Sequence, residues 1–168
     1  MESYNAARLA EMGIDCTFVQ DNHSYSATRG TLRGLHFQLP PHGQAKLVRC
    51  IAGAIRDVAV DVRKGSPTWG KWVAATLTAE RGEQLFVPEG FAHGFVTLTD
   101  HAEVAYKASG YYAPEADSGL AWNDPDIAVD WQLDGMQPLL SDKDAGLVRL
   151  AGFDSPFAYD GIPLAPLD

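Results

Sequence analysis

Two histidines stand in glycine-rich segments whose spacing could bring them into one cavity. Gly30 precedes His36 by six positions, and Gly82 is followed by a Pro-Glu-Gly turn at 88–90 and then by His93. Glycine and proline allow tight corners between short strands, so both imidazoles can point inward from neighbouring strands. An inward-facing histidine suits either metal binding or proton transfer near neutral pH.

The residues around these histidines argue against a metal. The spacing matches the two motifs of the cupin barrels, in which two His, a Glu and a third His hold Fe, Mn, Ni or Zn. Here Gln38 replaces the second His, Lys46 stands where the Glu would be, and Thr97 replaces the closing Asn. A protonated ammonium group repels a divalent cation and cannot bind it. We therefore expect no metal and no other cofactor, although His42 in a nearby turn is an alternative third ligand.

A histidine and a lysine in one barrel suit proton abstraction beside a carbonyl group. His36 is a base whose ordinary pKa lies near neutrality, and Lys46 can stabilise the enolate oxygen as a metal would. Epimerisation also needs an acid on the opposite face of the substrate. Tyr106 suits that role, because strand periodicity places it on the same apolar face as Val104 and Ala108.

Short strands must position these residues. Val58, Val60 and Val62 alternate with other residues, which is the period of a half-buried strand. Similar runs occupy 47–52, 72–78, 83–87, 92–99 and 102–108, with turn signals between them. This pattern predicts an all-β fold, a cupin-type jelly-roll β-barrel over about residues 15–135.

Short helices are expected to flank the barrel within one domain of residues 1–168. Residues 4–12 read as a helix that Gly13 ends, and a second helix is predicted from about Ser141 to Leu150.

Composition narrows the partners and the compartment. A formal net charge of -9 argues against nucleic acid and anionic membranes as partners. No apolar run approaches the roughly 20 residues needed to cross a bilayer, and the first residues lack a signal-peptide pattern. Two cysteines, Cys16 and Cys50, are too few for a disulfide framework, so we expect a cytoplasmic protein.

Longer segments resemble the dTDP-4-dehydrorhamnose 3,5-epimerase family, part of the cupin superfamily. The resemblance runs in collinear order from about residue 2 to 160 and is carried by 18–24, 32–38, 46–49, 57–61, 65–68, 88–95 and 122–125. It implies an isomerase that converts dTDP-4-keto-6-deoxy-D-glucose to dTDP-4-keto-L-rhamnose. The sugar would lose protons at C3 and C5, each beside the C4 ketone.

The same resemblance implies a role for each site residue. His36 would be the base, oriented by Asp144, while Lys46 would stabilise the enolate and Tyr106 would act as the acid. The substrate-binding residues that it implies are Glu2, Gln20, Asn22, Arg33, His93, Tyr112, Asp117 and Lys143. Among these, Tyr112 would stack on the thymine, and Arg33 and Lys143 would pair with the diphosphate. The family also implies a homodimer.

Several residues keep structural alternatives. Asp144 follows Ser141 by three positions, so its role could be limited to a helix-capping arrangement. His93 could have no role beyond supporting the loop after residue 88. Lys46 could be a solvated charge, Tyr106 could be core packing, and Tyr111 competes with Tyr112 for the stacking role. Asp57 and Asp61 alternate with valines, so a solvated face or a surface ion pair explains them.

Other functions stay open at this stage. An epimerase acting at C3 or C5 alone, or on another 4-keto-deoxysugar nucleotide, would keep the same acid–base residues. A metal-dependent cupin enzyme and a non-catalytic sugar-nucleotide binder are further alternatives. Family members usually begin earlier, with an Asp-x-Arg-Gly segment, so this sequence is either trimmed at its start or short. A protein without that segment is expected to bind its substrate and to dimerise more weakly.

Overall fold

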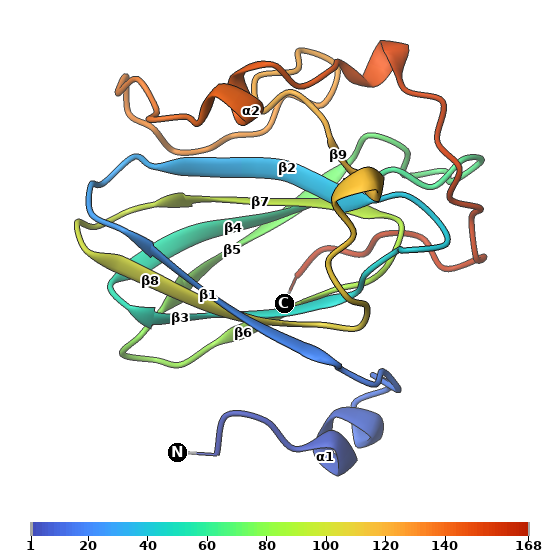
Figure 1. The fold of residues 1–168 in the computed structure, drawn as a ribbon, viewed down its shortest axis with the longest axis horizontal. Helices are drawn as coiled ribbons and strands as arrows, with labels where there is room; N and C mark the ends of the chain where they lie inside the picture. Colours follow the sequence, from blue (N-terminus) through green and yellow to red (C-terminus); the bar gives the residue numbers. More distant parts are fainter. Residues whose placement is uncertain (1, 168) are drawn as a thin grey trace.

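Two antiparallel sheets pack face to face in the computed structural model, which describes residues 2–167 (Figure 1). The first sheet contains, in spatial order, β1 (Gln20–Ser26), β8 (Ala102–Ala108), β3 (Lys46–Ala52) and β6 (Gln84–Val87). The second contains, in spatial order, β5 (Trp72–Thr78), β4 (Ala54–Asp61), β7 (Phe91–Thr97), β2 (Leu32–Gln38) and β9 (Asp117–Gly119). The predicted all-β jelly roll is confirmed.

Apolar side chains form two cores rather than one. Between the sheets, Val48, Ile55 and Val104 are buried in one cluster. A second cluster lies on the other side of the five-stranded sheet, where Val58 and Val60 of β4 pack with residues of the C-terminal segments. Those segments cover this sheet, as Figure 1 shows, so β4 is buried on both faces.

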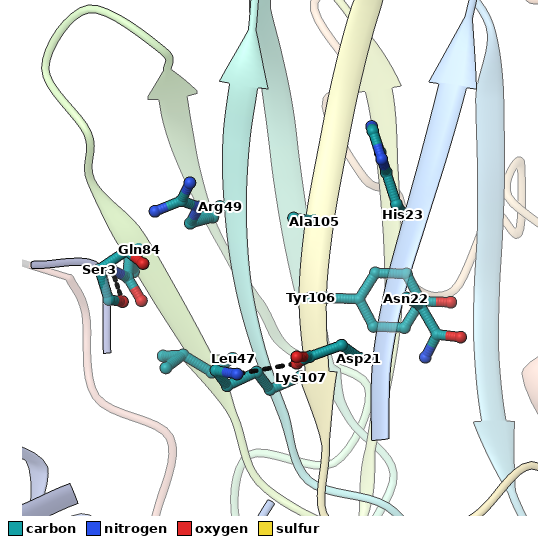
Figure 2. A pocket seen from close by; sticks show the side chains of 10 residues that line it. All are labelled: Ser3, Asp21, Asn22, His23, Leu47, Arg49, Gln84, Ala105, Tyr106 and Lys107. Carbon is teal, nitrogen blue, oxygen red and sulfur yellow. Dashed lines mark hydrogen bonds and ion pairs between the residues drawn. The ribbon is translucent and has the colours of Figure 1, made fainter. Parts of the chain in front are cut away.

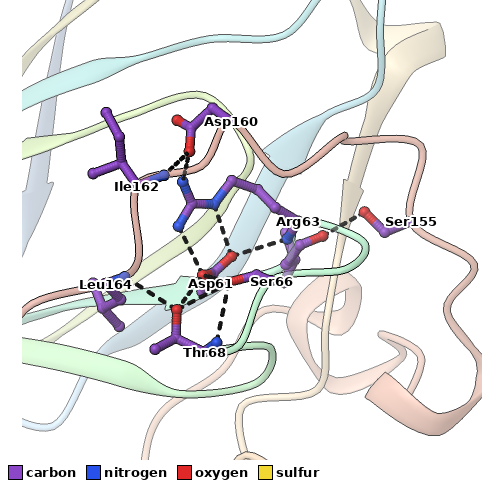
Figure 3. Close-up of polar contacts among 9 residues, drawn as sticks. Asp61, Arg63, Ser66, Thr68, Ser155, Asp160, Ile162 and Leu164 are labelled. Carbon is purple, nitrogen blue, oxygen red and sulfur yellow. Dashed lines mark hydrogen bonds and ion pairs between the residues drawn. The ribbon is translucent and has the colours of Figure 1, made fainter.

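Burial on both faces corrects the interpretation of Asp57 and Asp61. Both carboxylates were predicted on a solvated face, but neither is exposed at all. Asp61 accepts hydrogen bonds from Arg63 (2.8 and 2.9 Å), Ser66 (2.6 Å) and Thr68 (2.7 Å), as Figure 3 shows. Burial by itself would raise the pKa of Asp61, but these bonds outweigh it and lower the pKa to about 2.

The same cluster attaches the C-terminal segment to the end of β4. Arg63 also donates to Asp160 at 2.7 Å, and Ser155 donates to the carbonyl of Val62 (Figure 3). The backbone N–H of Leu164 donates to the Thr68 hydroxyl at 3.0 Å. The segment that covers the five-stranded sheet is therefore held by charge-assisted bonds as well as by apolar contacts.

The first helix agrees with its prediction, whereas the second is shorter. Helix α1 (Ala6–Glu11) lies within 4–12, capped by the Asn5 side chain. Helix α2 (Asp142–Ala145) begins after Ser141 but ends at Gly146, so the prediction of a helix through about residue 150 was wrong. The backbone of Val148 bonds to Ala121 instead, and only 3-10 turns occur at η1 (Pro114–Ala116) and η2 (Leu150–Gly152).

A bulge in β2 decides which way its side chains point. Arg33 pairs with Phe95 of β7, but His36 pairs with His93. Between these two pairs β2 therefore contains one residue more than β7. Residues three apart in a regular strand face opposite sides, and the extra residue turns Arg33 and His36 toward the same cavity. Gly34 at this point has a φ of +121°, and a Cβ there would lie 2.6 Å from the Gly94 Cα.

This contact predicts an unequal cost for alanine at two positive-φ glycines. Gly34→Ala should lower the free energy of unfolding by about 3 kcal/mol or more, because a clash adds to backbone strain. Gly65→Ala is the matched control: its φ is +85° and its Cβ would meet no atom within 4 Å. It should cost only about 1 kcal/mol. Urea denaturation measures both, and equal costs would contradict the close approach of β2 and β7.

Candidate active site

The predicted catalytic side chains meet in a cavity that opens between β1 and β2. It has two lobes, of about 260 and 290 Å³, and both are lined by His36, Lys46, Tyr106 and Lys143. The Tyr112 lobe adds Gln20, Asn22, Phe37, Gln38, Gln44, Tyr112 and Asp117. The Arg33 lobe adds Ser24, Arg33, His93, Phe95, Ser141 and Asp144.

Of the predicted site residues, Glu2 alone lies apart from both lobes. Its carboxylate accepts from the Asn5 amide at 3.2 Å and pairs with Arg8 at 3.3 Å, beside helix α1. Its role as a ligand contact stays a prediction. All the other predicted binding residues line one lobe or both.

The structure brings His36 and Asp144 into contact, although 107 residues separate them in the chain. The distance from His36 Nε2 to Asp144 Oδ1 is 2.5 Å. The Asp144 carboxylate also accepts from the Gly34 N–H at 3.3 Å and from the Ser141 hydroxyl at 2.7 Å. Burial would raise the pKa of Asp144, but these bonds and the imidazole hold it below its ordinary value.

An ionised Asp144 fixes the protonation pattern of the imidazole. A carboxylate can only accept, so in neutral His36 the proton lies on Nε2 and Nδ1 keeps a free electron pair. The capping alternative also holds, because the Asp144 N–H donates to the Ser141 hydroxyl at 3.1 Å. Asp144 therefore takes part in the N-terminal capping of α2, where Ser141 is the N-cap, and also holds the His36 imidazole.

Burial shifts the pKa values of Lys46 and Tyr106 in opposite directions. Burial lowers the pKa of Lys46 to about 8, with Asp57 and Asp117 opposing the shift and Lys143 adding to it. Burial raises the pKa of the Tyr106 hydroxyl, and the nearby Arg33 only partly opposes it. Near neutral pH the cavity therefore holds an ammonium group that can stabilise an oxyanion and a phenol that can donate a proton.

A second His–Asp pair in the cavity went unrecognised in the sequence. His93 Nε2 lies 2.7 Å from Asp57 Oδ1, and both side chains are buried. The other oxygen, Asp57 Oδ2, is buried with no hydrogen-bond partner within residues 2–167. Asp57 has the same strand parity as Ala59, which is buried between the sheets. This shared parity was the signal in the sequence that could have placed Asp57 inside the molecule. Because β4 is buried on both faces, parity alone could not reveal which side held the site.

Another hollow, of about 300 Å³, lies over the four-stranded sheet, as Figure 2 shows, and shares Asn22 and Tyr106 with the cavity. Arg49 and Leu47 line it, and Lys107 pairs with Asp21 at 2.8 Å. Its histidine, His23, is exposed and is bound to a neighbouring carboxylate. Its imidazole and its ammonium group are thus both paired with surface carboxylates, whereas the cavity combines these groups with a buried carboxylate. Among residues 2–167, no three His, Cys, Asp or Glu side chains are grouped to hold a metal ion.

A profile of the dTDP-4-dehydrorhamnose 3,5-epimerase family matches residues 1–152 of this chain. The chain belongs to that family. The relative from Shigella flexneri is 53% identical over 145 residues, which cover 86% of this chain and 78% of the relative. The relative from Escherichia coli is 50% identical over 151 residues, or 89% and 80% of the two chains. The predicted family and isomerase class are confirmed.

Solved structures of the family have the same fold. The epimerase of Bacillus anthracis, solved with TDP and PPi bound, has a TM-score of 0.85 and 51% identity over 88% of this chain and 83% of its own. The enzyme of Legionella pneumophila, solved in complex with dTDP-4-keto-L-rhamnose, has a TM-score of 0.86 and 48% identity. That match covers 91% of this chain and 80% of the Legionella chain.

Because Asp57 raises the pKa of Lys46, we predict that replacing Asp57 changes how activity depends on pH. Epimerase activity that needs the Lys46 ammonium should fall as pH rises through about 8. Asp57 and Asp117 attract the Lys46 ammonium group and Lys143 repels it. The other titratable groups that line the cavity are Arg33, His36, His93, Tyr106, Tyr112 and Asp144. Asp57→Asn removes an attraction that raises the pKa of Lys46, so the alkaline limb of kcat/KM should move to lower pH.

The control for this profile is Asp21→Asn, which removes an exposed carboxylate paired with Lys107. Its alkaline limb should match that of the unaltered protein. A limb that stays in place in Asp57→Asn would show that Asp57 does not set the charge of Lys46.

Proposed function

We propose that this protein epimerises dTDP-4-keto-6-deoxy-D-glucose at C3 and C5 to dTDP-4-keto-L-rhamnose, in deoxysugar nucleotide biosynthesis. The observation that carries the proposal is the meeting of His36, Lys46 and Tyr106 around one cavity in a chain of this family. A ketone at C4 acidifies the hydrogens on both neighbouring carbons. A base, an oxyanion partner and an acid are the groups that such a reaction requires.

In this mechanism His36 Nδ1 removes a proton from the carbon beside the ketone. The electron pair of the broken C–H bond moves to form the enolate, whose oxygen accepts a hydrogen bond from the Lys46 ammonium group. Tyr106 returns a proton to the opposite face of that carbon, which inverts it. His36 then loses its proton to water and Tyr106 regains one, so the new hydrogen comes from solvent.

The two lobes suggest how the substrate lies. The Tyr112 ring is exposed at the entrance of its lobe, near Gln20 and Asn22, where it can stack on the thymine. Lys143 lines both lobes, as expected of a group that pairs with the diphosphate between base and sugar.

Arg33 belongs at the sugar end in this arrangement. It lines the lobe that holds His93, and its guanidinium donates to the Tyr25 carbonyl at 3.2 Å. Its buried Nε–H has no partner within residues 2–167, so it is available to a sugar or phosphate oxygen. We therefore assign Arg33 to the sugar and its nearest phosphate.

We further propose a cytoplasmic homodimer. Cys16 and Cys50 are both free thiols, which suits a reducing compartment. No helix within residues 2–167 has the length and apolar character to span a membrane. Light scattering after size exclusion should give about twice the chain mass of 18.2 kDa. A mass of one chain would contradict the dimer.

A single-carbon epimerase is the second candidate. The 3'-monoepimerase of Streptomyces bikiniensis, solved in complex with dTDP-quinovose, has a TM-score of 0.82 and 39% identity over 89% of this chain and 75% of its own. A metal-dependent cupin reaction is disfavoured by the position of Lys46. One equivalent of tightly bound transition metal in protein purified without chelators would reverse that assignment.

Solvent deuterium separates these candidates. We expect dTDP-4-keto-6-deoxyglucose incubated with the protein in D2O to gain deuterium at both C3 and C5, as NMR detects. Deuterium at one carbon alone would favour the single-carbon epimerase. No deuterium at either carbon, with dTDP still bound, would identify a non-catalytic binder.

The same assay tests the base. His36→Asn keeps a side chain that can bond to Asp144 but has no basic nitrogen, so deuterium exchange should slow by about a thousandfold. Binding of dTDP should change only a few-fold, because the nucleotide is assigned to the Tyr112 lobe. Tyr106→Phe is the companion variant and should slow net epimerisation. Exchange at the unaltered rate in His36→Asn would remove His36 from the mechanism.

A further inference from the structure

The segment 110–113, which carries Tyr112, lies outside any regular strand or helix. It joins β8 to η1, and the side chains of Tyr111 and Tyr112 are 71% and 57% exposed. Apolar packing therefore does not fix the position of either ring. The Tyr112 hydroxyl donates to Asp117 at 2.9 Å, and glutamine side chains hold the backbone of the segment.

Gln38, the last residue of β2, makes the largest share of these bonds. Its Nε2 donates to the Tyr111 carbonyl at 3.2 Å and to the His42 carbonyl at 2.7 Å, and its Oε1 accepts from the Ala113 N–H at 2.8 Å. The residue is only 4% exposed. A carboxamide has two N–H donors and a carbonyl acceptor, and all three functions are used. One side chain therefore joins the loop 39–44 to the segment 110–113.

Two further glutamines complete the support. Gln44, in the same loop, donates to the Gly110 carbonyl at 2.6 Å. Gln20 of β1 accepts from the Tyr112 N–H at 3.0 Å. Every residue of the segment 110–113 thus has a backbone group bonded to a glutamine, and Gln38 alone bonds to two of them.

We propose that Gln38 is a positioning residue for nucleotide binding. Its buried carboxamide holds the segment 110–113 against the loop 39–44, and so holds Tyr112 where it can stack on the base. This inference rests on the proposed function, which assigns the Tyr112 lobe to the nucleotide. A histidine at this position, as in the cupin metal motif, has only two ring nitrogens and could not make three bonds.

The test removes the bonds while keeping the shape of the side chain. Gln38→Met should weaken dTDP binding, measured by calorimetry, by about tenfold, because the loss of bonds to the segment frees Tyr112. The kcat at saturating substrate should stay within about twofold, while KM rises. Amide hydrogen exchange at Tyr112 and Ala113 should become faster.

Gln84→Met is the matched control. The Gln84 amide also donates to a backbone carbonyl, that of Ser3 at 2.8 Å (Figure 2), but Gln84 lines neither lobe of the cavity. This variant should leave dTDP binding and exchange at Tyr112 unchanged. If Gln38→Met folds poorly, Gln44→Met removes the bond to Gly110 from a less buried position and should weaken dTDP binding in the same direction.

A double variant distinguishes positioning from a separate contact. In a Tyr112→Ala background, Gln38→Met should cause no further loss of dTDP binding, because the two residues act through one ring. Losses that multiply, or unchanged exchange at 112–113, would overturn the inference. Faster exchange with unaltered dTDP binding in Gln38→Met and in Tyr112→Ala would instead overturn the assignment of the Tyr112 lobe to the nucleotide.

Discussion

The close approach of Gly34 to Gly94 is the constraint on which the site depends. It allows β2 to carry one residue more than β7, so that Arg33 and His36 face the same cavity. The Gly34 N–H at this bulge and the His36 imidazole both donate to the same Asp144 oxygen. One backbone irregularity therefore turns His36, the proposed base, toward the cavity and also supplies an N–H that binds Asp144.

Buried charge in and beside the cavity is stabilised by hydrogen-bond partners and by nearby charges of opposite sign. Asp144 has His36, Asp57 has His93, and the Lys46 ammonium is attracted to Asp57. An isolated buried ion would cost several kcal/mol, so each charge must have a partner or change its protonation state. The pKa of Lys46 is lowered because Asp57 and Asp117 do not fully offset the burial of its ammonium group. In the proposed mechanism an enolate oxygen would supply further negative charge beside it.

Strand positions could be predicted from the sequence, whereas the directions of some side chains could not. Alternating residues located β3 and β5 to within a residue or two, because local periodicity follows from one buried face. The same reasoning misplaced Asp57, since the C-terminal segments bury the other face of β4 and remove the contrast between its sides. The bulge at Gly34 and the early end of α2 depend on long-range backbone contacts, which residue types at neighbouring positions do not encode.

The pairing of His36 with Asp144 can form only late in translation, because the two residues are 108 positions apart in the chain. The strand that carries His36 is synthesised early, but Asp144 follows 108 positions later, and the Asp160 partner of Arg63 later still. Contacts between such distant residues form slowly and only once the intervening chain is available. A nascent chain that has not yet reached Asp144 therefore holds His36 without the carboxylate that binds its imidazole.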